Sequence, residues 1–225
     1  MEKVKRGIAA ELYGPALAMG ESPAMSTGRK IPRTGPGRLR IIGGEWRGRR
    51  LEFPSRPDLR PTPDRVRETL FNWLAPVLAG ARVVDLFAGS GALGLEALSR
   101  GAAEAWLVER DPALARVLAE HVARLGANAR VIRDDTRRFL KRQHGADVRF
   151  DIAFVDPPYR EPVEPWLRLL DPVLAPSAIV YVERPLPEGL PDDVGGEWTK
   201  RSRAGGVEFG LLVKKSGSDP NFGGE

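Results

Sequence analysis

The 225-residue sequence contains no cysteine and only two histidines, His121 and His144. Without cysteine the chain can form no disulfide and no thiolate metal site, and a reducing compartment suits it. Two imidazoles are too few for the usual zinc or haem ligand sets, so we expect no metal centre. No apolar run approaches the roughly 18 residues of a membrane span, so we expect no membrane association. The length suffices for one good-sized core with small appendages.

Acidic residues are scarce in one segment, although the net charge of the whole chain is only +5. Between Arg29 and Arg67 there are 12 basic and 4 acidic residues, a local charge of +8, and the remainder has 23 basic and 26 acidic residues. This concentrated charge predicts a polyanionic partner. Arginine outnumbers lysine there, which favours bidentate phosphate contacts and stacking. A generally arginine-rich composition is the alternative, but it does not explain the local imbalance of sign.

The first 37 residues show no sustained periodicity. Basic residues precede an apolar stretch, as in a secretion signal, but Glu11, Gly14 and Pro15 interrupt that stretch. We therefore expect a disordered extension and a cytoplasmic protein. The expected division of the chain is an extension over 1–37, a basic β-ribbon arm over 38–59, an α/β domain over 60–215 and a flexible tail over 216–225.

The basic segment contains a predicted β-ribbon over 38–53. Two β-prone runs flank a turn at Gly43 and Gly44. The ribbon is amphipathic, and we expect its arginines and Trp46 to be exposed beside a set of aliphatic residues. A basic ribbon with an exposed tryptophan is typical of a nucleic-acid-binding arm. The alternative is a surface hairpin whose tryptophan packs on the rest of the protein.

A helix is predicted to follow the ribbon, with Thr62 as its N-cap and Pro63 at its first position. Its apolar residues recur at helical spacing and predict a buried stripe of Val66, Leu70, Trp73, Leu74 and Val77. The first turn can present arginines and a helix N-terminus to anionic groups, although Arg65 and Glu68 can equally pair on the surface. The residues that we expect to contact nucleic acid are Arg40, Trp46, Arg47, Arg49, Arg60, Arg65 and Arg67.

From Arg82 onward, strand and helix patterns alternate, which is typical of a mostly parallel sheet with helices on both faces. The predicted strands lie near 82–86, 104–109, 129–132, 151–155 and 178–183. The predicted helices lie near 91–100, 112–125, 135–143 and, in a shorter form, 161–171. Two further strands are expected to form an antiparallel hairpin that closes the sheet, over 197–203 and 207–214. We interpret His121 as a packing residue at the edge of a helix.

A glycine loop follows the first of these strands. Gly89, Gly91 and Gly94 satisfy G-x-G-x-x-G between a strand and a helix, and Glu109 ends the next strand about 20 residues later. Such a loop lets a ligand approach the backbone closely, and the carboxylate can hold ribose hydroxyls. These features also fit NAD, and with it a dinucleotide-dependent oxidoreductase.

Two further carboxylates favour a different cofactor. Asp85, before the loop, would repel a pyrophosphate but can help to hold a cation. S-adenosylmethionine has no phosphate and carries a sulfonium and an ammonium group. Asp135 follows the third strand, where it is placed to accept a hydrogen bond from an adenine amine. For each carboxylate taken alone, capping of the next helix is the alternative.

The fourth strand runs into the stiff turn Asp156-Pro157-Pro158-Tyr159. The proline pair ends the strand, and a residue before proline is restricted to extended geometry. Asp156, the Pro157 carbonyl and the Tyr159 ring are therefore displayed at the carboxyl end of a strand, where open α/β sheets bind ligands. Together they suit a planar group that carries an NH2. A strand-ending turn with a capping aspartate is the alternative.

The blocks Phe87-Ala-Gly-Ser-Gly and Asp156-Pro-Pro-Tyr159 together resemble S-adenosylmethionine-dependent methyltransferases that act on exocyclic amines. With 40–49 and 60–74, the sequence resembles the bacterial 16S ribosomal RNA guanine-N2 methyltransferase family over about residues 38–214. The resemblance implies a Rossmann-like class I methyltransferase fold, with 60–215 as the methyltransferase domain. It also implies S-adenosylmethionine contacts from Asp85, Phe87, Gly89, Gly91, Glu109, Arg110, Asp135, Thr136 and Asp156.

The resemblance further implies how a guanine N2 amine is methylated. Asp156 and the Pro157 carbonyl would accept its N–H bonds and turn its lone pair toward the methyl group, while Tyr159 stacks on the extruded base. We expect Asp156 mainly to orient the amine, and whether it also takes the proton stays open. The expected partner is 16S rRNA, free or in a partly assembled small subunit, and the expected state is a monomer.

Three other functions stay open at this point. The Asp-Pro-Pro-Tyr turn serves any exocyclic amine, so an N6-adenine or other amino methyltransferase acting on RNA or DNA is the first alternative. The glycine loop alone permits an NAD-dependent oxidoreductase, which cofactor titration would separate from a methyltransferase. A non-catalytic RNA-binding protein is the third, although an intact donor and acceptor site would be superfluous in it.

Overall fold

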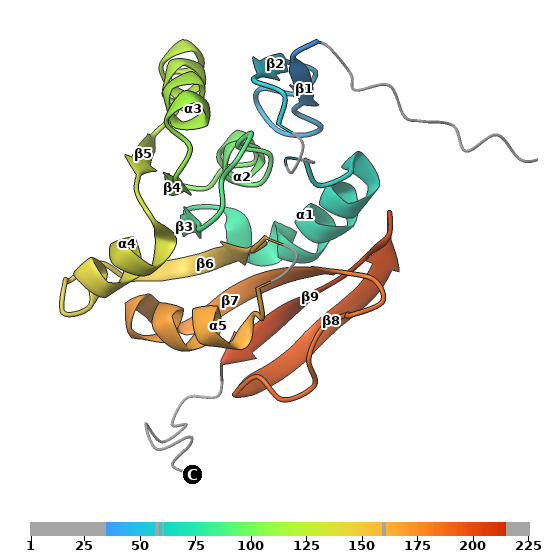
Figure 1. Cartoon of the computed structure of the whole chain (residues 1–225), viewed down its shortest axis with the longest axis vertical. Coiled ribbons are helices and arrows are strands. Elements are labelled where there is room, and N and C mark those ends of the chain that lie inside the picture. The colour runs from blue at the N-terminus through green and yellow to red at the C-terminus, as the bar shows by residue number, and fades with distance from the viewer. Residues whose placement is uncertain (1–34, 57–58, 60, 159–160, 215–225) are drawn as a thin grey trace, which may run out of the picture. The chain divides into compact units, whose positions relative to one another are not determined.

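The computed structural model describes residues 35–56, 59, 61–158 and 161–214. A seven-stranded sheet has the order β5-β4-β3-β6-β7-β9-β8 (Figure 1), and a separate two-stranded sheet pairs β1 with β2. The strands are β1 (Gly37–Arg40), β2 (Arg50–Phe53), β3 (Arg82–Asp85), β4 (Glu104–Glu109), β5 (Ala129–Arg133), β6 (Phe150–Val155), β7 (Leu174–Pro185), β8 (Gly196–Ala204) and β9 (Val207–Lys214). The helices are α1 (Asp64–Leu78), α2 (Gly94–Ser99), α3 (Pro112–Leu125), α4 (Thr136–Gln143) and α5 (Glu164–Leu170), followed by a short 3-10 turn.

The larger sheet confirms the predicted class. Its strands are parallel from β5 to β7, and β9 is antiparallel to both β7 and β8. The chain builds β4 and β5 on one side of β3 and then crosses to β6 on the other side, so the strand order reverses between β3 and β6. In open α/β sheets, ligands bind at the carboxyl ends of the strands beside such a reversal.

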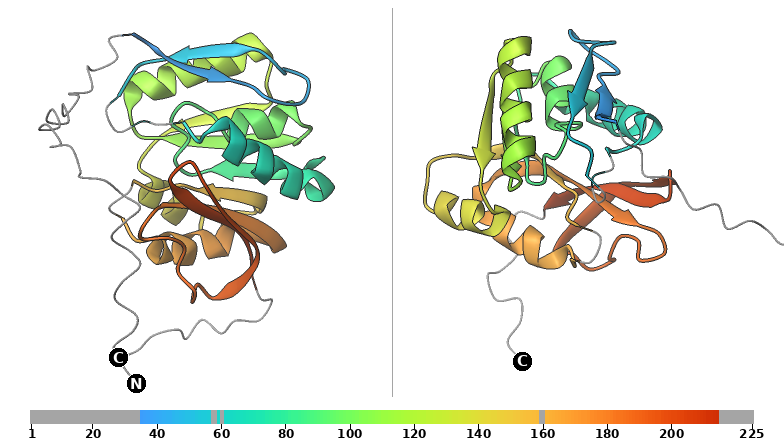
Figure 2. Two further views of the ribbon diagram at one scale, coloured as in Figure 1. Left: turned by 90° about the vertical axis from the view of Figure 1, so that its right-hand side faces the viewer. Right: turned by 45° about the horizontal axis from the view of Figure 1, so that its top comes forward.

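Helices cover both faces of the sheet (Figure 2), and one apolar cluster lies on each face. Alternate strand residues point to opposite faces, so Val83 packs with α1, α2 and α3, whereas Val84 packs with α4 and α5. Both faces are buried, and for this reason the central strands read as continuous hydrophobic runs. Because the helices cover both faces, a ligand can reach the sheet at the carboxyl ends of its strands.

Some predicted boundaries are wrong for identifiable reasons. The helix expected over 91–100 is only α2, because Gly89 and Gly91 adopt the positive φ angles of 50° and 81° that a right-handed helix does not allow. The helix after the glycine loop therefore starts at its third glycine. The last parallel strand extends beyond the expected 178–183 at both ends, because Leu174 pairs with Phe150 of β6 and β9 pairs with the strand as far as Pro185.

The two-stranded sheet corresponds to the predicted ribbon, but it packs on the helices of the larger sheet. Leu39 and Leu51 are opposite one another and buried in the same cluster as α1 and α3. His121 of α3 is also buried, and its Nε2 makes a 2.8 Å hydrogen bond with the Glu52 carbonyl, which confirms its packing role. The prediction of an exposed tryptophan is wrong, because Trp46 in the connecting loop is only 6% exposed.

Helix α1 begins one residue later than predicted. Pro63 occupies the cap position, and no side chain caps the helix, so the assignment of Thr62 as N-cap is wrong. The Thr62 hydroxyl instead hydrogen-bonds Glu183 of β7. The buried stripe continues through Leu78, and Val77, which was expected within it, is 47% exposed.

Neither a membrane span nor a metal-binding cluster occurs in the part of the chain that the structure describes. None of its helices is long and apolar enough to cross a membrane. No group of three or more histidine or acidic side chains there is arranged to hold a metal ion.

Candidate active site

Acidic side chains of four neighbouring strands lie on one face of the sheet, at its carboxyl edge. Residues in register on parallel strands share a face, and so do residues two apart along one strand. Asp85 of β3 is in register with Leu107 of β4 and Phe154 of β6, and Phe154 is in register with Tyr181 of β7. The other three acids each follow one of these partners by two residues: Glu109 follows Leu107, Asp156 follows Phe154, and Glu183 follows Tyr181.

Two of these carboxylates hold the glycine loop. Asp85 accepts a hydrogen bond from the Gly94 N–H at 3.2 Å, and Glu109 accepts one from the Gly89 N–H at 2.8 Å. A Cβ at Gly94 would lie 2.2 Å from a methyl carbon of Leu107, so a larger residue would force the buried Leu107 side chain to move. The loop backbone is therefore fixed beside the two carboxylates and open to a ligand.

Burial gives Asp85 an unusual affinity for a proton. The pKa of this carboxyl rises from 3.8 to about 7, mainly because of burial and to a small extent because of the nearby Glu109, while hydrogen bonds from the Gly94 and Phe87 N–H groups act in the opposite direction. An ionised Asp85 is therefore costly in the empty protein and is stabilised by a positive charge placed next to it. This side of the site suits a cationic ligand.

Asp156, at the end of β6, is half-buried and stands among other acids. Burial raises its pKa well above the usual range, Glu183 and Asp85 raise it further, and Arg184 opposes them. Pro157 is buried and Pro158 is exposed, whereas Tyr159 lies outside the described residues. The excess of carboxyl groups makes this side of the site suited to a hydrogen-bond donor such as an amine.

Asp135 and Thr136 stand after β5, as predicted for the far end of a cofactor site. Asp135 is exposed and caps α4, because its Oδ1 accepts the Arg138 N–H at 3.1 Å. The Thr136 hydroxyl is buried and donates to the Leu86 carbonyl at 2.7 Å. The capping alternative for Asp135 is thus realised with one carboxylate oxygen.

Phe87 and Arg110 complete the predicted cofactor residues. Phe87 follows β3 and is half-buried, and its ring meets Trp166 of α5 edge-on, with centroids 5.1 Å apart. Arg110 directly follows β4 and is exposed. The predicted cofactor residues Phe87, Arg110 and Asp135 follow β3, β4 and β5. The fold therefore brings their backbones, with the glycine loop, to one edge of the sheet.

Two of the predicted nucleic-acid contacts are wrong, because the side chains are buried. Trp46 belongs to the core, and Arg67 of α1 is only 1% exposed. The four predicted arginines that are exposed are Arg40, Arg47, Arg49 and Arg65. Arg60 lies outside the described residues. In the described part of the positive segment, Arg67 is buried and supports the structure, whereas the other arginines are exposed.

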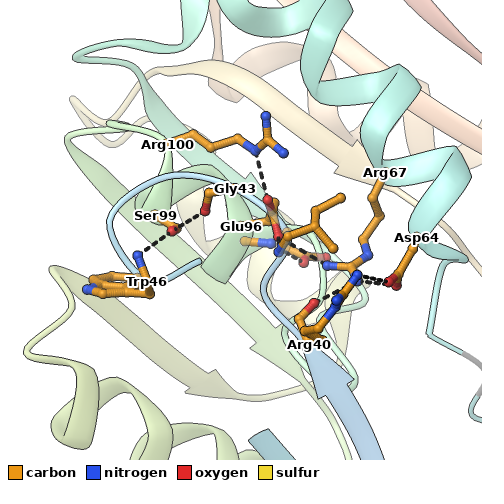
Figure 3. A network of polar contacts seen from close by, with 11 residues as sticks. Arg40, Gly43, Trp46, Asp64, Arg67, Glu96, Ser99 and Arg100 are labelled. Atoms are coloured by element: carbon orange, nitrogen blue, oxygen red, sulfur yellow. Dashed lines mark hydrogen bonds and ion pairs between the residues drawn. The ribbon is translucent and has the colours of Figure 1, made fainter. Parts of the chain in front are cut away.

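Figure 3 shows that Arg67 belongs to a polar network beneath the ribbon. Glu96 of α2 is fully buried and accepts hydrogen bonds from Arg67 at 3.1 Å, from Arg100 at 2.7 Å and from the Ile42 N–H at 2.9 Å. Arg67 also donates to the Arg40 carbonyl at 2.9 Å. The strand end of the ribbon is thus fastened to the helix that follows the glycine loop.

A second part of the same network holds the turn of the ribbon. The Ser99 hydroxyl accepts the Trp46 N–H at 2.9 Å and donates to the Gly43 carbonyl at 2.6 Å (Figure 3). Gly44 has a φ of +74°, and a Cβ there would lie 1.7 Å from the Ser99 carbonyl oxygen. These contacts fix the loop that carries the exposed Arg47.

Two functional candidates, Glu183 and Glu96, were missed from the sequence. Glu183 ends a predicted strand in an acid, as Asp85 and Glu109 do, so the same pattern that selected those residues was available for it. Glu96 gave no comparable signal, because an acidic residue in the first turn of a helix is also typical of an exposed surface.

The strand order, the glycine loop at the reversal and the strand-end carboxylates define a Rossmann-like S-adenosylmethionine-dependent methyltransferase. The family described as "Conserved hypothetical protein 95" matches residues 39–212, and the chain belongs to that family.

Relatives and a solved structure extend this assignment. Ribosomal RNA small subunit methyltransferase D of Escherichia coli (strain K12) is 47% identical over 194 residues, which are 84% of this chain and 96% of that protein. The putative rRNA methyltransferase YlbH of Bacillus subtilis is 34% identical, over 80% of this chain and 100% of that protein. The structure of the putative methyltransferase yhhF from Escherichia coli superposes with a TM-score of 0.72 at 45% identity, over 80% of this chain and 100% of that one. The family resemblance found in the sequence is confirmed.

Proposed function

We propose that this protein transfers the methyl group of S-adenosylmethionine to the exocyclic N2 amine of a guanine in 16S ribosomal RNA. The observation that carries the proposal is the position of Asp156, which shares one sheet face with the carboxylates of the glycine loop. The relatives named as rRNA methyltransferases support an rRNA substrate. The proposal includes a monomer that acts in the cytoplasm, on free rRNA or on a partly assembled small subunit.

The residues around the glycine loop fit the methyl donor. When bound, S-adenosylmethionine supplies an electrophilic methyl group on a positively charged sulfur. Asp85 provides negative charge for the cationic end of the donor, and Glu109 accepts hydrogen bonds from ribose hydroxyls. Asp135 accepts from the adenine amine with the oxygen that does not cap α4. The glycines let the donor approach the backbone.

The acceptor side positions the amine. The Asp156 carboxylate and the Pro157 carbonyl accept the two N–H groups of the guanine N2 amine, which draws its lone pair out of conjugation with the ring. Tyr159 stacks on the base after the base has left its surroundings in the RNA. Pro158 keeps the turn stiff. Positioning of this kind accounts for most of the rate gain expected in an in-line displacement.

The decisive experiment is transfer of a labelled methyl group to small-subunit rRNA that lacks the modification, with and without ribosomal proteins. Mass mapping of the product should find N2-methylguanine at one position. A product methylated at adenine N6, or transfer to DNA, would replace the proposal with its first alternative. Binding of NAD without binding of S-adenosylmethionine would support an oxidoreductase instead.

The affinity for S-adenosylmethionine is expected to rise with pH through neutrality. Asp85, with a pKa of about 7, is mostly protonated at pH 6 and mostly ionised at pH 8, and only the ionised form attracts a sulfonium. We expect the Kd to fall several-fold between these pH values, and to fall less for S-adenosylhomocysteine, whose sulfur is neutral. Calorimetric titration of the wild type and of Asp85→Asn measures this. The same pH dependence in Asp85→Asn would exclude Asp85 as its source.

Reversing the charge of Arg47 and Arg49 is expected to weaken RNA binding at least tenfold at about 100 mM salt. Each lost phosphate contact should also flatten the plot of log affinity against log salt by about 0.7 to 0.9. Both residues are exposed on the loop that the Ser99 network holds. Arg168→Glu is the matched control, because Arg168 is exposed on α5, which covers the opposite face of the sheet. An unchanged salt slope in the Arg47→Glu/Arg49→Glu variant would exclude this loop as a phosphate contact.

A further inference from the structure

A buried glutamate stands next to the proposed acceptor residue. Val155 of β6 is in register with Val182 of β7, so the residues that follow them, Asp156 and Glu183, lie opposite one another on one sheet face. Neighbouring strands are about 4.8 Å apart, which brings the two carboxyl groups close together. Glu183 is only 5% exposed.

Burial raises the pKa of Glu183, and two hydrogen bonds to its carboxylate oppose this rise. The buried Tyr181 hydroxyl donates to its Oε2 at 2.6 Å, and the buried Thr62 hydroxyl forms a second hydrogen bond. Hydrogen bonds donated to a carboxylate stabilise its negative charge. Burial and the neighbouring Glu183 raise the pKa of Tyr181, so this hydroxyl keeps its proton and remains a donor.

The charged groups around Asp156 are mostly negative. Glu183 and the neutral Tyr181 face Asp156 from β7, and Asp85 faces it from β3. The positive charge of Arg184 opposes the effect of these acids on the pKa of Asp156. Two carboxylates this close cannot both ionise freely, and the one that accepts fewer hydrogen bonds takes a proton more readily. Glu183 accepts two, so the proton goes to Asp156.

We propose that Glu183 is a positioning residue of the acceptor site, whose fixed negative charge makes Asp156 the group that receives the proton released by the methylated amine. This inference rests on the proposed function and deepens it. The amine lone pair forms the new N–C bond as the C–S bond breaks, and the electron pair of the broken bond stays on sulfur. The amine nitrogen then carries a positive charge and gives one proton to the Asp156 carboxylate, which later releases it to solvent. Protonation of Asp156 also relieves its repulsion with Glu183.

The test is the pH profile of single-turnover methyl transfer by the Glu183→Gln variant. Without the neighbouring charge, Asp156 should ionise at lower pH, so the acidic limb of the profile should move down by about one unit or more. Asp156 should also be a weaker proton acceptor, so the plateau rate should fall about tenfold. The KM for RNA and the thermal stability should change little. Tyr181→Phe should move the limb in the same direction by less, because Glu183 then holds its charge less firmly.

Glu208→Gln is the matched control. Glu208 is also a buried glutamate of the sheet, but it bonds the Leu190 N–H and Arg201, away from Asp156. Its profile should superimpose on that of the wild type. A wild-type profile for Glu183→Gln would overturn the inference, and if that variant does not fold, a wild-type profile for Tyr181→Phe would overturn it. Failure of the proposed function is distinct, because the wild type itself would then not methylate 16S rRNA.

Discussion

An Asp156→Ala variant is expected to lose methyl transfer while it keeps its affinity for S-adenosylmethionine. The alanine removes the carboxylate that accepts an amine N–H, and the free lone pair then stays conjugated with the ring. We expect the single-turnover rate to fall about 1,000-fold, which corresponds to about 4 kcal/mol of transition-state stabilisation. The glycine loop should still hold the donor, because Asp85 and Glu109 fix it without Asp156.

Two further substitutions sharpen this test. Asp156→Asn keeps a carbonyl oxygen as acceptor but cannot take a proton at neutral pH, so its rate should lie between those of the wild type and the alanine variant. Asp151→Asn is the control at the other end of β6, where Asp151 accepts the Arg82 N–H at 2.8 Å, far along the strand from the site. An equal loss of transfer and of S-adenosylmethionine binding in Asp156→Ala would contradict the assignment of Asp156 to the amine.

The α/β sheet was predictable because its central strands are buried on both faces. Such strands need apolar residues at every position, and the helices between them need an apolar stripe, so each element leaves its own period in the sequence. The glycine loop was equally predictable from the sequence. The positive φ angle of Gly91 and the close packing of Gly94 against Leu107 disfavour other residues at these positions. Strand ends were less predictable, because β7 is prolonged by its pairing with β9, which comes later in the chain.

The errors concern residues whose environment is set by distant parts of the chain. Trp46 lies in a basic, glycine-rich turn, and only the packing of that turn on α2 shows that its ring is buried. Arg67 resembles its exposed neighbour Arg65, but their places in the helical turn differ, and Glu96 lies beside only one of them. The register of β6 and β7 places Glu183 beside Asp156, and local sequence patterns do not specify this register.

A Glu96→Gln variant is expected to lose about 3 kcal/mol of unfolding free energy, because it removes the fully buried partner of Arg67 and leaves only the half-exposed Asp64, at 2.7 Å, to balance that charge. Both side chains are almost completely buried, and their hydrogen bond is 3.1 Å long. Denaturant unfolding measures the loss. Glu52→Gln is the control, since Glu52 pairs with Arg38 at 3.1 Å on the surface, where solvent screens the pair and its removal should change stability little.

The Glu96→Gln substitution should also affect RNA binding and S-adenosylmethionine binding to different extents. Glu96 accepts the Ile42 N–H, so its loss should loosen the ribbon and weaken RNA binding more than S-adenosylmethionine binding. A double variant that also replaces Arg67 with Met should be less destabilised than the sum of the two single variants, because it leaves no unpaired buried charge. Additive losses in this cycle would show that the two residues act separately.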